Sequence, residues 1–352
     1  VDEIAGGEGS RDVPRIRDEV LVCHSLSFWK HRAEDNAEPV YQISGGLAFD
    51  AKGKHVAHHT GQYHARTVTL TGATPTEVLT AYGALVGSLS VSQSVILGHA
   101  PDMPEEYEIR PQSKLPGDGQ GVYFIGGKPT IARLKSHFEA SRIQLLDFDP
   151  VPRMPESWHA IDEGGRWDLL TKALPEFAGA ARLTIPSSSA RVLAADGSPI
   201  KSGPLSTHTY VITDCPLSTP DFDEARTALM VRLWARGLGY VKKSTAGADL
   251  KRSIVDSSVW LTGREVFDGP PCVKPPNRLA DLSSVTVDGG MVSIVTDITD
   301  ADAQGFEAAC PGARVIRAKD DTGTPGGEHH GGSMKSQTQI RTRAARIAIE
   351  DH

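Results

Sequence analysis

The order of strand and helix patterns between residues 143 and 243 constrains the fold of this chain more than any other feature. Short apolar runs rich in β-branched residues predict strands at residues 143–146, 182–185, 208–213 and 239–243. Helical patterns lie at residues 154–177 and 219–234. The second helix has clear ends, because Thr219-Pro220 is typical of a helix start and Gly237 of the position after a helix. The order is therefore strand, helix, strand, strand, helix, strand.

This order is typical of a ferredoxin-like βαββαβ unit, a four-stranded antiparallel sheet with helices on one face. A chain of 352 residues has room for about two domains. We predict an α+β protein with four parts, which are a flexible segment at 1–19, an α/β lobe at 20–139, the βαββαβ core at 140–275 and a C-terminal extension at 276–352. In the extension, residues 320–336 are predicted to be disordered and residues 337–350 to form a short basic helix.

The predicted N-terminal lobe is rich in strands over residues 20–72 and then enters a helix. Thr74 is suited to the N-cap, Pro75 to the first turn, and Glu77 to the third position of a capping box. The apolar face of this helix consists of Val78, Leu79, Tyr82, Leu85 and Val86. The pattern then predicts a strand at 94–97, a long loop at 100–128 and a short helix at 130–139.

Composition favours a globular protein of the cytoplasm. Hydrophobic residues make up 39% of the chain and charged residues 23%, and no apolar run reaches the ~18 residues of a membrane span. No secretory signal pattern opens the sequence. The four cysteines are far apart and form no CxxC, so neither disulfides nor a thiol zinc site is expected. The net charge of -7 weakens the case for a nucleic-acid-binding protein, because phosphate binders usually carry a basic field. A local basic stripe can still lie on a protein that is acidic overall.

The run IQLLDFDP, residues 143–150, places two carboxylates at the end of a predicted buried strand. Side chains alternate along a strand, so Asp147 and Asp149 point to one face with Cα atoms roughly 6–7 Å apart. Mg²⁺ or Mn²⁺ would relieve the repulsion between them, because these ions prefer oxygen ligands. The alternative is the start of a solvated loop. Asp221 and Asp223 repeat the spacing, but the helix dipole accounts for acidic residues in a first turn.

Three further features favour phosphate and metal chemistry. Ser206-Thr207-His208 offers an imidazole at a strand start, where a structural histidine is the alternative. Arg252 and Asp256 in KRSIVD combine a phosphate-binding cation with a third carboxylate, unless they form a surface salt-bridge cluster. Ser188 lies in a serine run after a strand and can bind phosphate, although an ordinary polar turn would also contain it.

The succession DFD, SSS, small-x-His and RSIVD resembles the archaeo-eukaryotic primase superfamily, or primase-polymerases, of the bacterial kind associated with plasmids, phages and integrated elements. GLGY and VFDGPP are similar in layout. The resemblance covers residues 140–275 well and 66–140 loosely. The chain departs from those proteins at Ser206 and Ala190, where they usually have glycine, and it has no cysteine cluster for the zinc-binding insert that many of them carry.

The resemblance implies an RRM-like (ferredoxin-like βαββαβ) catalytic core beside an N-terminal α/β lobe. It implies that two Mg²⁺ or Mn²⁺ ions bind to three catalytic aspartates, Asp147, Asp149 and Asp256. It also implies that His208 contacts the incoming nucleotide, with Ser206, Arg252 and Ser188 as further nucleotide-binding candidates.

The implied function is a DNA primase-polymerase that transfers nucleotides on a single-stranded DNA template during replication of a plasmid, phage or integrated element. Nucleoside triphosphates and single-stranded DNA are the expected partners, and a replicative helicase is a further candidate. No membrane association is expected. The candidate DNA-binding residues are Lys242, Lys243 and Lys251, with Tyr210 or Trp234 as weaker stacking candidates. The alternatives are a non-catalytic replication or origin-binding protein with the same core, and a metal-dependent nuclease.

Overall fold

The structure is a computed structural model. It describes residues 15–25, 30–31, 41–43, 47–49, 55–58, 61–148, 154–159, 161–200, 206–216, 219–243, 247–256, 259–310, 312–316, 339–341 and 346–349.

A seven-stranded mixed sheet contains most of the predicted N-terminal lobe. In sheet order its strands are β17 (Glu265–Val266), β7 (Gln93–Leu97), β1 (Ile16–Ser25), β6 (Tyr63–Gly72), β8 (Glu106–Arg110), β10 (Lys128–Ala132) and β9 (Tyr123–Ile125). β8 and β10 run parallel and the other neighbours antiparallel. β17 comes from the predicted core region, so the two regions share this sheet.

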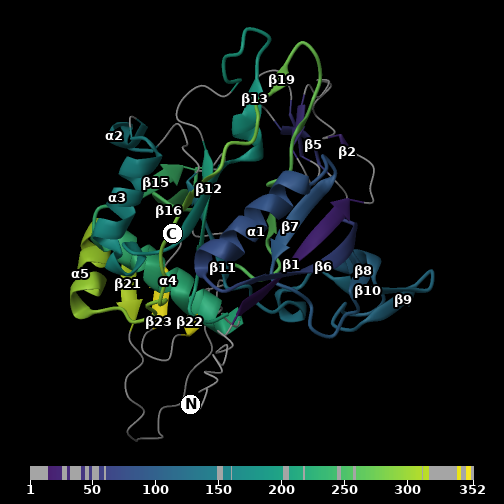
Figure 1. Ribbon diagram of the computed structural model, residues 1–352. Helices are drawn as coiled ribbons and strands as arrows, with labels where there is room; N and C mark the ends of the chain where they lie inside the picture. Colours follow the sequence, from purple (N-terminus) through teal and green to yellow (C-terminus); the bar gives the residue numbers. More distant parts are fainter. Residues whose placement is uncertain are drawn as a thin grey trace, which may run out of the picture.

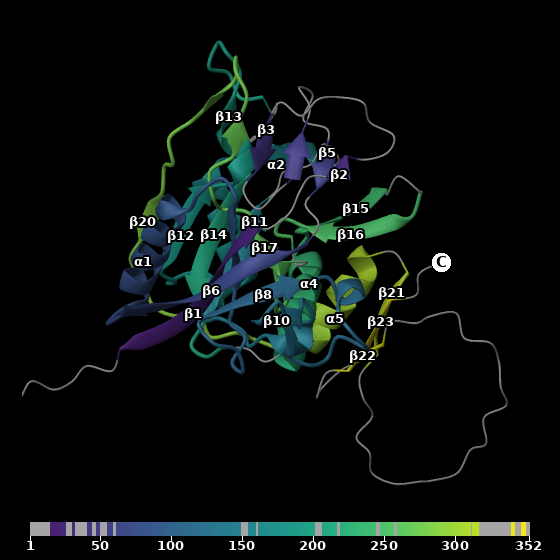
Figure 2. The same ribbon diagram turned by 90° about the vertical axis from the view of Figure 1, so that its right-hand side faces the viewer.

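A four-stranded antiparallel sheet holds the centre of the predicted core. In order its strands are β11 (Ile143–Phe148), β14 (Thr207–Ile212), β12 (Arg182–Pro186) and β20 (Val285–Val287). The first three have the order expected of a ferredoxin-like sheet. The expected fourth strand, β15 (Gly239–Lys243), instead pairs with β16 (Asp249–Ser253) in a separate hairpin, which lies on the side of the molecule away from α1 (Pro75–Ser88) (Figure 2). The α+β class is therefore confirmed, whereas the RRM-like assignment stays a prediction.

Five helices are present among the described residues. They are α1, α2 (Glu156–His159), α3 (Glu163–Ala173), α4 (Thr219–Ala235) and α5 (Asp300–Ala309). Four 3₁₀ turns also occur, η1 (Gln112–Lys114), η2 (Lys135–His137), η3 (Pro175–Phe177) and η4 (Ser188–Arg191). Helical structure over residues 154–177 and 219–234 is thus confirmed. No helix in the described ranges has the length and apolar character needed to cross a membrane.

Helix α1 lies between the two main sheets (Figure 1). Its predicted N-cap is confirmed, because the Thr74 hydroxyl accepts the Glu77 N–H at 3.2 Å. The Glu77 carboxylate accepts the N–H of Ala73 at 2.8 Å, one residue before the partner expected for a capping box. The predicted apolar face is buried at Val78, Leu79, Tyr82 and Val86, in one core with strands of both sheets. This shared core joins the N-terminal lobe to the four-stranded sheet.

Smaller sheets complete the described fold. One of them has five strands, in the order β18 (Cys272–Val273), β3 (Tyr41–Ile43), β4 (Leu47–Phe49), β5 (His55–His58) and β2 (Lys30–His31). The others are β13 (Val192–Leu193) with β19 (Arg278–Leu279), and β21 (Ala313–Ile316), β23 (Arg346–Ile349) and β22 (Gln339–Arg341).

Four sequence predictions are wrong. Residues 100–128 are not one long loop and residues 130–139 are not a helix, because β8, β9, β10 and two 3₁₀ turns occupy them. Gly126 and Gly127, with φ of 60° and 79°, form the two-residue turn between β9 and β10, and this glycine pair was a hairpin signal. Residues 16–19 belong to β1 rather than to a flexible lead, while residues 1–14 lie outside the description. Strands β22 and β23 replace the helix expected at 337–350, and residues 320–336 are not described.

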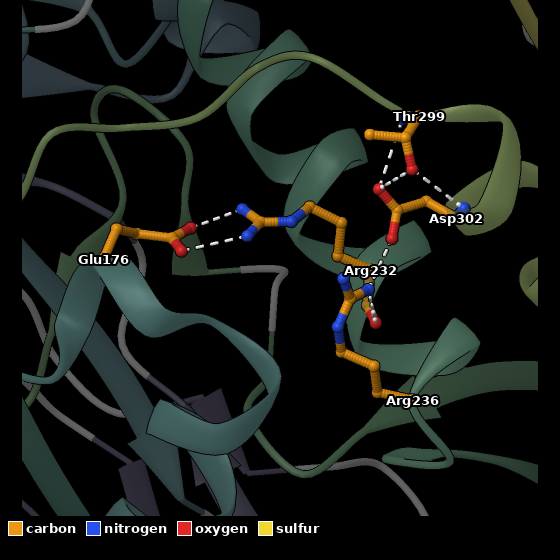
Figure 3. Close-up of polar contacts among 5 residues, drawn as sticks. All are labelled: Glu176, Arg232, Arg236, Thr299 and Asp302. Atoms are coloured by element: carbon orange, nitrogen blue, oxygen red, sulfur yellow. Dashed lines mark hydrogen bonds and ion pairs between the residues drawn. The ribbon is translucent and has the colours of Figure 1, made fainter.

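Charged contacts hold helix α4 on two sides (Figure 3). Arg232 forms a bidentate pair with Glu176 of η3, in which one N–O distance is 2.9 Å. Arg236 pairs with Asp302, which also accepts hydrogen bonds from the N–H and hydroxyl of Thr299 in the capping box of α5. Burial would raise the pKa of Asp302, but the hydrogen bonds from Arg236 and Thr299 and the charge of Arg236 outweigh it and lower the pKa.

Replacing Asp302 by Asn should lower the free energy of unfolding by about 1–3 kcal/mol at pH 7, because a buried charged acceptor is lost. Since the folded pKa lies below the unfolded value, this difference should be complete above about pH 4 and shrink as the pH falls through the folded pKa. Urea denaturation of both proteins at several pH values measures it. Asp300→Asn, at an exposed site in the same helical turn, is the control. An equal loss in the control would contradict this prediction.

Candidate functional site

Asp147 and His208 are directly opposite each other on the neighbouring strands β11 and β14. Residues opposite each other in an antiparallel pair have their side chains on one face of the sheet. His208 Nε2 lies 3.8 Å from Asp147 Oδ1, and the two side chains are only 11% and 18% exposed. An imidazole and a carboxylate thus meet at the end of a buried strand, as the sequence motifs predict.

Asp256 reaches the same strand end from a distant part of the sequence. Its backbone N–H donates to the carbonyl of Asp147 at 2.9 Å. Farther along, Trp260 Nε1 donates to the carbonyl of Leu145 in β11 at 2.7 Å, while Ile254 N–H donates to Leu238 C=O, just after α4, at 2.9 Å. Asp256 and Trp260 therefore each make a hydrogen bond to the β11 backbone.

The carboxylates Asp147 and Asp256 are hard oxygen ligands of the kind that Mg²⁺ and Mn²⁺ prefer, so the donor set fits such an ion. Asp149, the third predicted ligand, lies outside the described residues. In the described part of the chain, no group of three or more His, Cys, Asp or Glu side chains is arranged to hold a metal ion. Metal binding here stays a prediction that depends on all three aspartates.

Asp268 is a site residue that the sequence reasoning missed. Its Oδ1 lies 2.6 Å from Nδ1 of His208, and its side chain is completely buried. Its Oδ2 accepts hydrogen bonds from the hydroxyls of Tyr82, at 2.8 Å, and of Tyr210. The VFDGPP run contains Asp268, but nothing local in that run shows that it returns to His208.

The two tyrosines bring together separate parts of the fold at Asp268, since Tyr82 comes from α1 and Tyr210 from β14. Burial, followed by the negative charge of Asp268, raises the pKa of each tyrosine well above its usual range. Both hydroxyls therefore keep their protons and act as hydrogen-bond donors to the carboxylate.

Ser188 lies behind this cluster rather than on the surface of the site. It is 2% exposed, and its hydroxyl lies within hydrogen-bonding distance of the carbonyls of Phe267 and Gly269, the latter at 2.7 Å. These carbonyls flank Asp268, so Ser188 holds the segment that carries the carboxylate. Ser206 is also buried, and its carbonyl accepts the Ser187 N–H at 3.0 Å. Phosphate binding by either serine stays a prediction.

Replacing Ser188 by Ala should lower the free energy of unfolding by about 1–3 kcal/mol, because buried carbonyls lose their donor. Thermal or urea denaturation measures the loss. Ser189→Ala is the matched control, because Ser189 is half-buried in the same serine run and contacts the hydroxyl of Ser187 at 3.4 Å. Unchanged stability in Ser188→Ala would show that its hydroxyl does not hold the 267–269 segment.

The predicted DNA-binding lysines do not share one face of the β15–β16 hairpin. The register pairs Tyr240 with Arg252 and Lys242 with Leu250 on one face. It pairs Val241 with Lys251 and Lys243 with Asp249 on the other. The first face packs against α2, because Tyr240 meets Trp158 edge to face at 5.8 Å between ring centroids. The second face packs against α4 and α5 through Val241.

Tyr210 and Trp234 are not available for stacking on nucleic acid bases. Their exposed fractions are 0% and 2%, so their ring faces are covered by other side chains. The suggestion that they stack on bases is therefore wrong, because both rings belong to the core.

Comparisons of the chain with known proteins found no match to any protein-family model, curated protein or solved structure. The assignment to a family therefore stays a prediction from the motifs.

Proposed function

We propose that this protein is a DNA primase-polymerase that joins nucleotides on a single-stranded DNA template. The observation that carries the proposal is the hydrogen bond between the backbones of Asp256 and Asp147, with His208 opposite Asp147 on β14. Three motifs that the sequence separates are thereby neighbours. The order β11, β14, β12 supports an RRM-like core, although β15 lies outside its sheet.

In this proposal the three aspartates hold the divalent ions at the end of β11. When bound, Mg²⁺ or Mn²⁺ ions would activate the attacking hydroxyl and stabilise the leaving pyrophosphate. In its imidazolium form, His208 donates a hydrogen bond from Nε2 to an oxygen of the triphosphate while Nδ1 donates to Asp268. Arg252, four residues before Asp256, supplies a guanidinium that can hold a second phosphate oxygen bidentately.

The test is an incorporation assay with the full chain, a primed or unprimed single-stranded DNA template, labelled ribo- or deoxynucleotides and Mg²⁺ or Mn²⁺. We expect extension that stops when a chelator is added. Degradation of the template without nucleotide addition would instead identify a nuclease. DNA binding that a chelator leaves unchanged, without incorporation, would identify a non-catalytic replication or origin-binding protein. Either result would overturn the proposal.

Lys242 lies on the same hairpin face as Arg252, the proposed triphosphate ligand, so we expect this face to be directed toward the nucleic acid. Replacing Lys242 by Ala should weaken single-stranded DNA binding and reduce the slope of log K against log salt by about 0.7, the value for one lost phosphate contact. Fluorescence anisotropy at several salt concentrations measures both. Lys243→Ala is the control, because Lys243 pairs with Asp249 at 2.5 Å on the other face. An equal effect in the control would contradict the choice of face.

A further inference from the structure

We propose that Asp268 is a positioning residue that holds the His208 ring with its Nδ1 protonated and its Nε2 directed to the Asp147 end of β11. The inference rests on the proposed function in one respect, which is that the ligand of Nε2 is a nucleotide triphosphate. The structural part, in which Asp268 accepts the Nδ1 proton of His208 and orients its ring, rests on the geometry of the buried cluster.

The two nitrogens of the His208 ring face different carboxylates. Nδ1 of His208 lies 2.6 Å from Oδ1 of Asp268, whereas Nε2 lies 3.8 Å from Oδ1 of Asp147. Oδ2 of Asp268 accepts from two tyrosine hydroxyls, so this carboxyl group acts as an acceptor and Nδ1 of His208 is the donor to its Oδ1. The partner of one ring nitrogen determines what the other nitrogen can do. Asp268 therefore determines how Nε2 is presented.

The carboxylate of Asp268 is itself held in place by three side chains. The hydroxyls of Tyr82 and Tyr210 donate to Oδ2, and the raised pKa of each tyrosine keeps those protons in place. Ser188 holds the carbonyls on both sides of Asp268. With two tyrosine donors on Oδ2, Oδ1 is the oxygen directed at His208.

Tyr82 belongs to α1 of the N-terminal lobe, whereas His208 and Tyr210 belong to the four-stranded sheet. The lobe therefore helps to orient an imidazole in the neighbouring sheet. This gives the α1 contact a role at the site in addition to its role in the core.

A second buried carboxylate provides a matched control. Glu265 accepts hydrogen bonds from the hydroxyls of Tyr63 and Ser94, each at 2.6 Å, and from Arg133 at 3.0 Å. Like Asp268 it is buried and accepts a hydrogen bond from a tyrosine hydroxyl, while Ser94 and Arg133 donate to it where His208 donates to Asp268. Glu265→Gln removes a buried charge as Asp268→Asn does, so general effects of burial appear in both variants.

The first measurement is ¹⁵N and ¹H NMR of the histidine-labelled full chain at one pH. His208 is assigned by the signals that His208→Gln removes. We expect a low-field Nδ1–H resonance for His208 that is displaced or lost in Asp268→Asn, shifted in Tyr82→Phe, and unchanged in Glu265→Gln. A wild-type His208 protonated only at Nε2 would overturn the proposal, and so would an unchanged resonance in Asp268→Asn. If Asp268→Asn does not fold, the wild-type and Tyr82→Phe spectra decide.

The second measurement separates KM from kcat in the incorporation assay. Loss of a group that orients an active-site ligand typically costs about 10–100-fold, so we expect KM for the nucleotide to rise by that factor in Asp268→Asn, with kcat less affected. Glu265→Gln should leave KM unchanged, and an equal KM effect there would overturn the role of Asp268. If the wild type shows no incorporation, the proposed function fails, whereas the NMR result still decides whether Asp268 positions His208.

Discussion

Replacing Asp147 or Asp256 by Asn is expected to lower the rate of nucleotide incorporation by at least about 100-fold, the usual cost of removing a preorganised electrostatic group. Asn keeps the shape of the side chain but removes the negative charge that would hold a divalent ion. The backbone bond from Asp256 N–H to Asp147 C=O does not involve either side chain, so it should persist in both variants. Incorporation rates at saturating Mg²⁺ or Mn²⁺ measure the effect.

The matched control for this prediction is Asp223→Asn. Asp221 and Asp223 repeat the DxD spacing, but Asp223 pairs with Lys135 at 3.6 Å and with Arg226 at 3.4 Å. We expect Asp223→Asn to leave incorporation unchanged. A thermal melt of each variant separates loss of activity from loss of fold. Equal incorporation in wild type and in the Asp147 and Asp256 variants would end the metal-site assignment.

Replacing Trp260 by Ala is expected to lower the free energy of unfolding by about 3–5 kcal/mol, as large-to-small changes at buried aromatic sites do. Trp260 is 2% exposed, and its indole N–H donates to the carbonyl of Leu145 in β11. This bond holds Trp260 beside the strand, four residues after Asp256. Incorporation should therefore fall as well, because Asp256 would no longer be held next to Asp147. Urea denaturation and the incorporation assay measure the two effects.

Two Phe variants isolate the hydrogen bond from the packing. Trp234 is also 2% exposed, but no acceptor in the described residues lies within hydrogen-bonding distance of its Nε1. Trp260→Phe should therefore cost about 1–3 kcal/mol more than Trp234→Phe, because it leaves the Leu145 carbonyl without its donor. A smaller loss in Trp260→Phe than in Trp234→Phe would show that the indole N–H does not hold the segment.

The elements that the sequence predicted correctly have strong local signals. The Thr74 cap, Pro75 and the apolar spacing indicated α1, and Thr219-Pro220 with Gly237 indicated α4. Residues 100–139 were predicted wrongly because many Pro, Gly and Asp residues flank short strands there. Those strands are stabilised by neighbours such as β6, which are distant in sequence. Local pattern alone does not contain that pairing.

For the candidate site, motif order predicted that Asp147, His208 and Asp256 are neighbours, and the backbone contacts support this. It did not predict Asp268, whose importance depends on a fold that returns residue 268 to β14. Nor did it predict that Ser188 faces the 267–269 segment, or that the hairpin lysines divide between two faces. Each of these depends on register or on side-chain direction, which short motifs do not specify.

The sequence by itself determined the α+β class, the main helices and the chemical types of residue at the end of β11, because these follow from local periodicity, capping and composition. Only the tertiary structure decided that β15 leaves the four-stranded sheet, that β17 joins the other sheet, and that Tyr82 and Asp268 meet His208. The physical reason is that buried polar groups must find partners wherever the chain brings them, and those partners are far away in sequence.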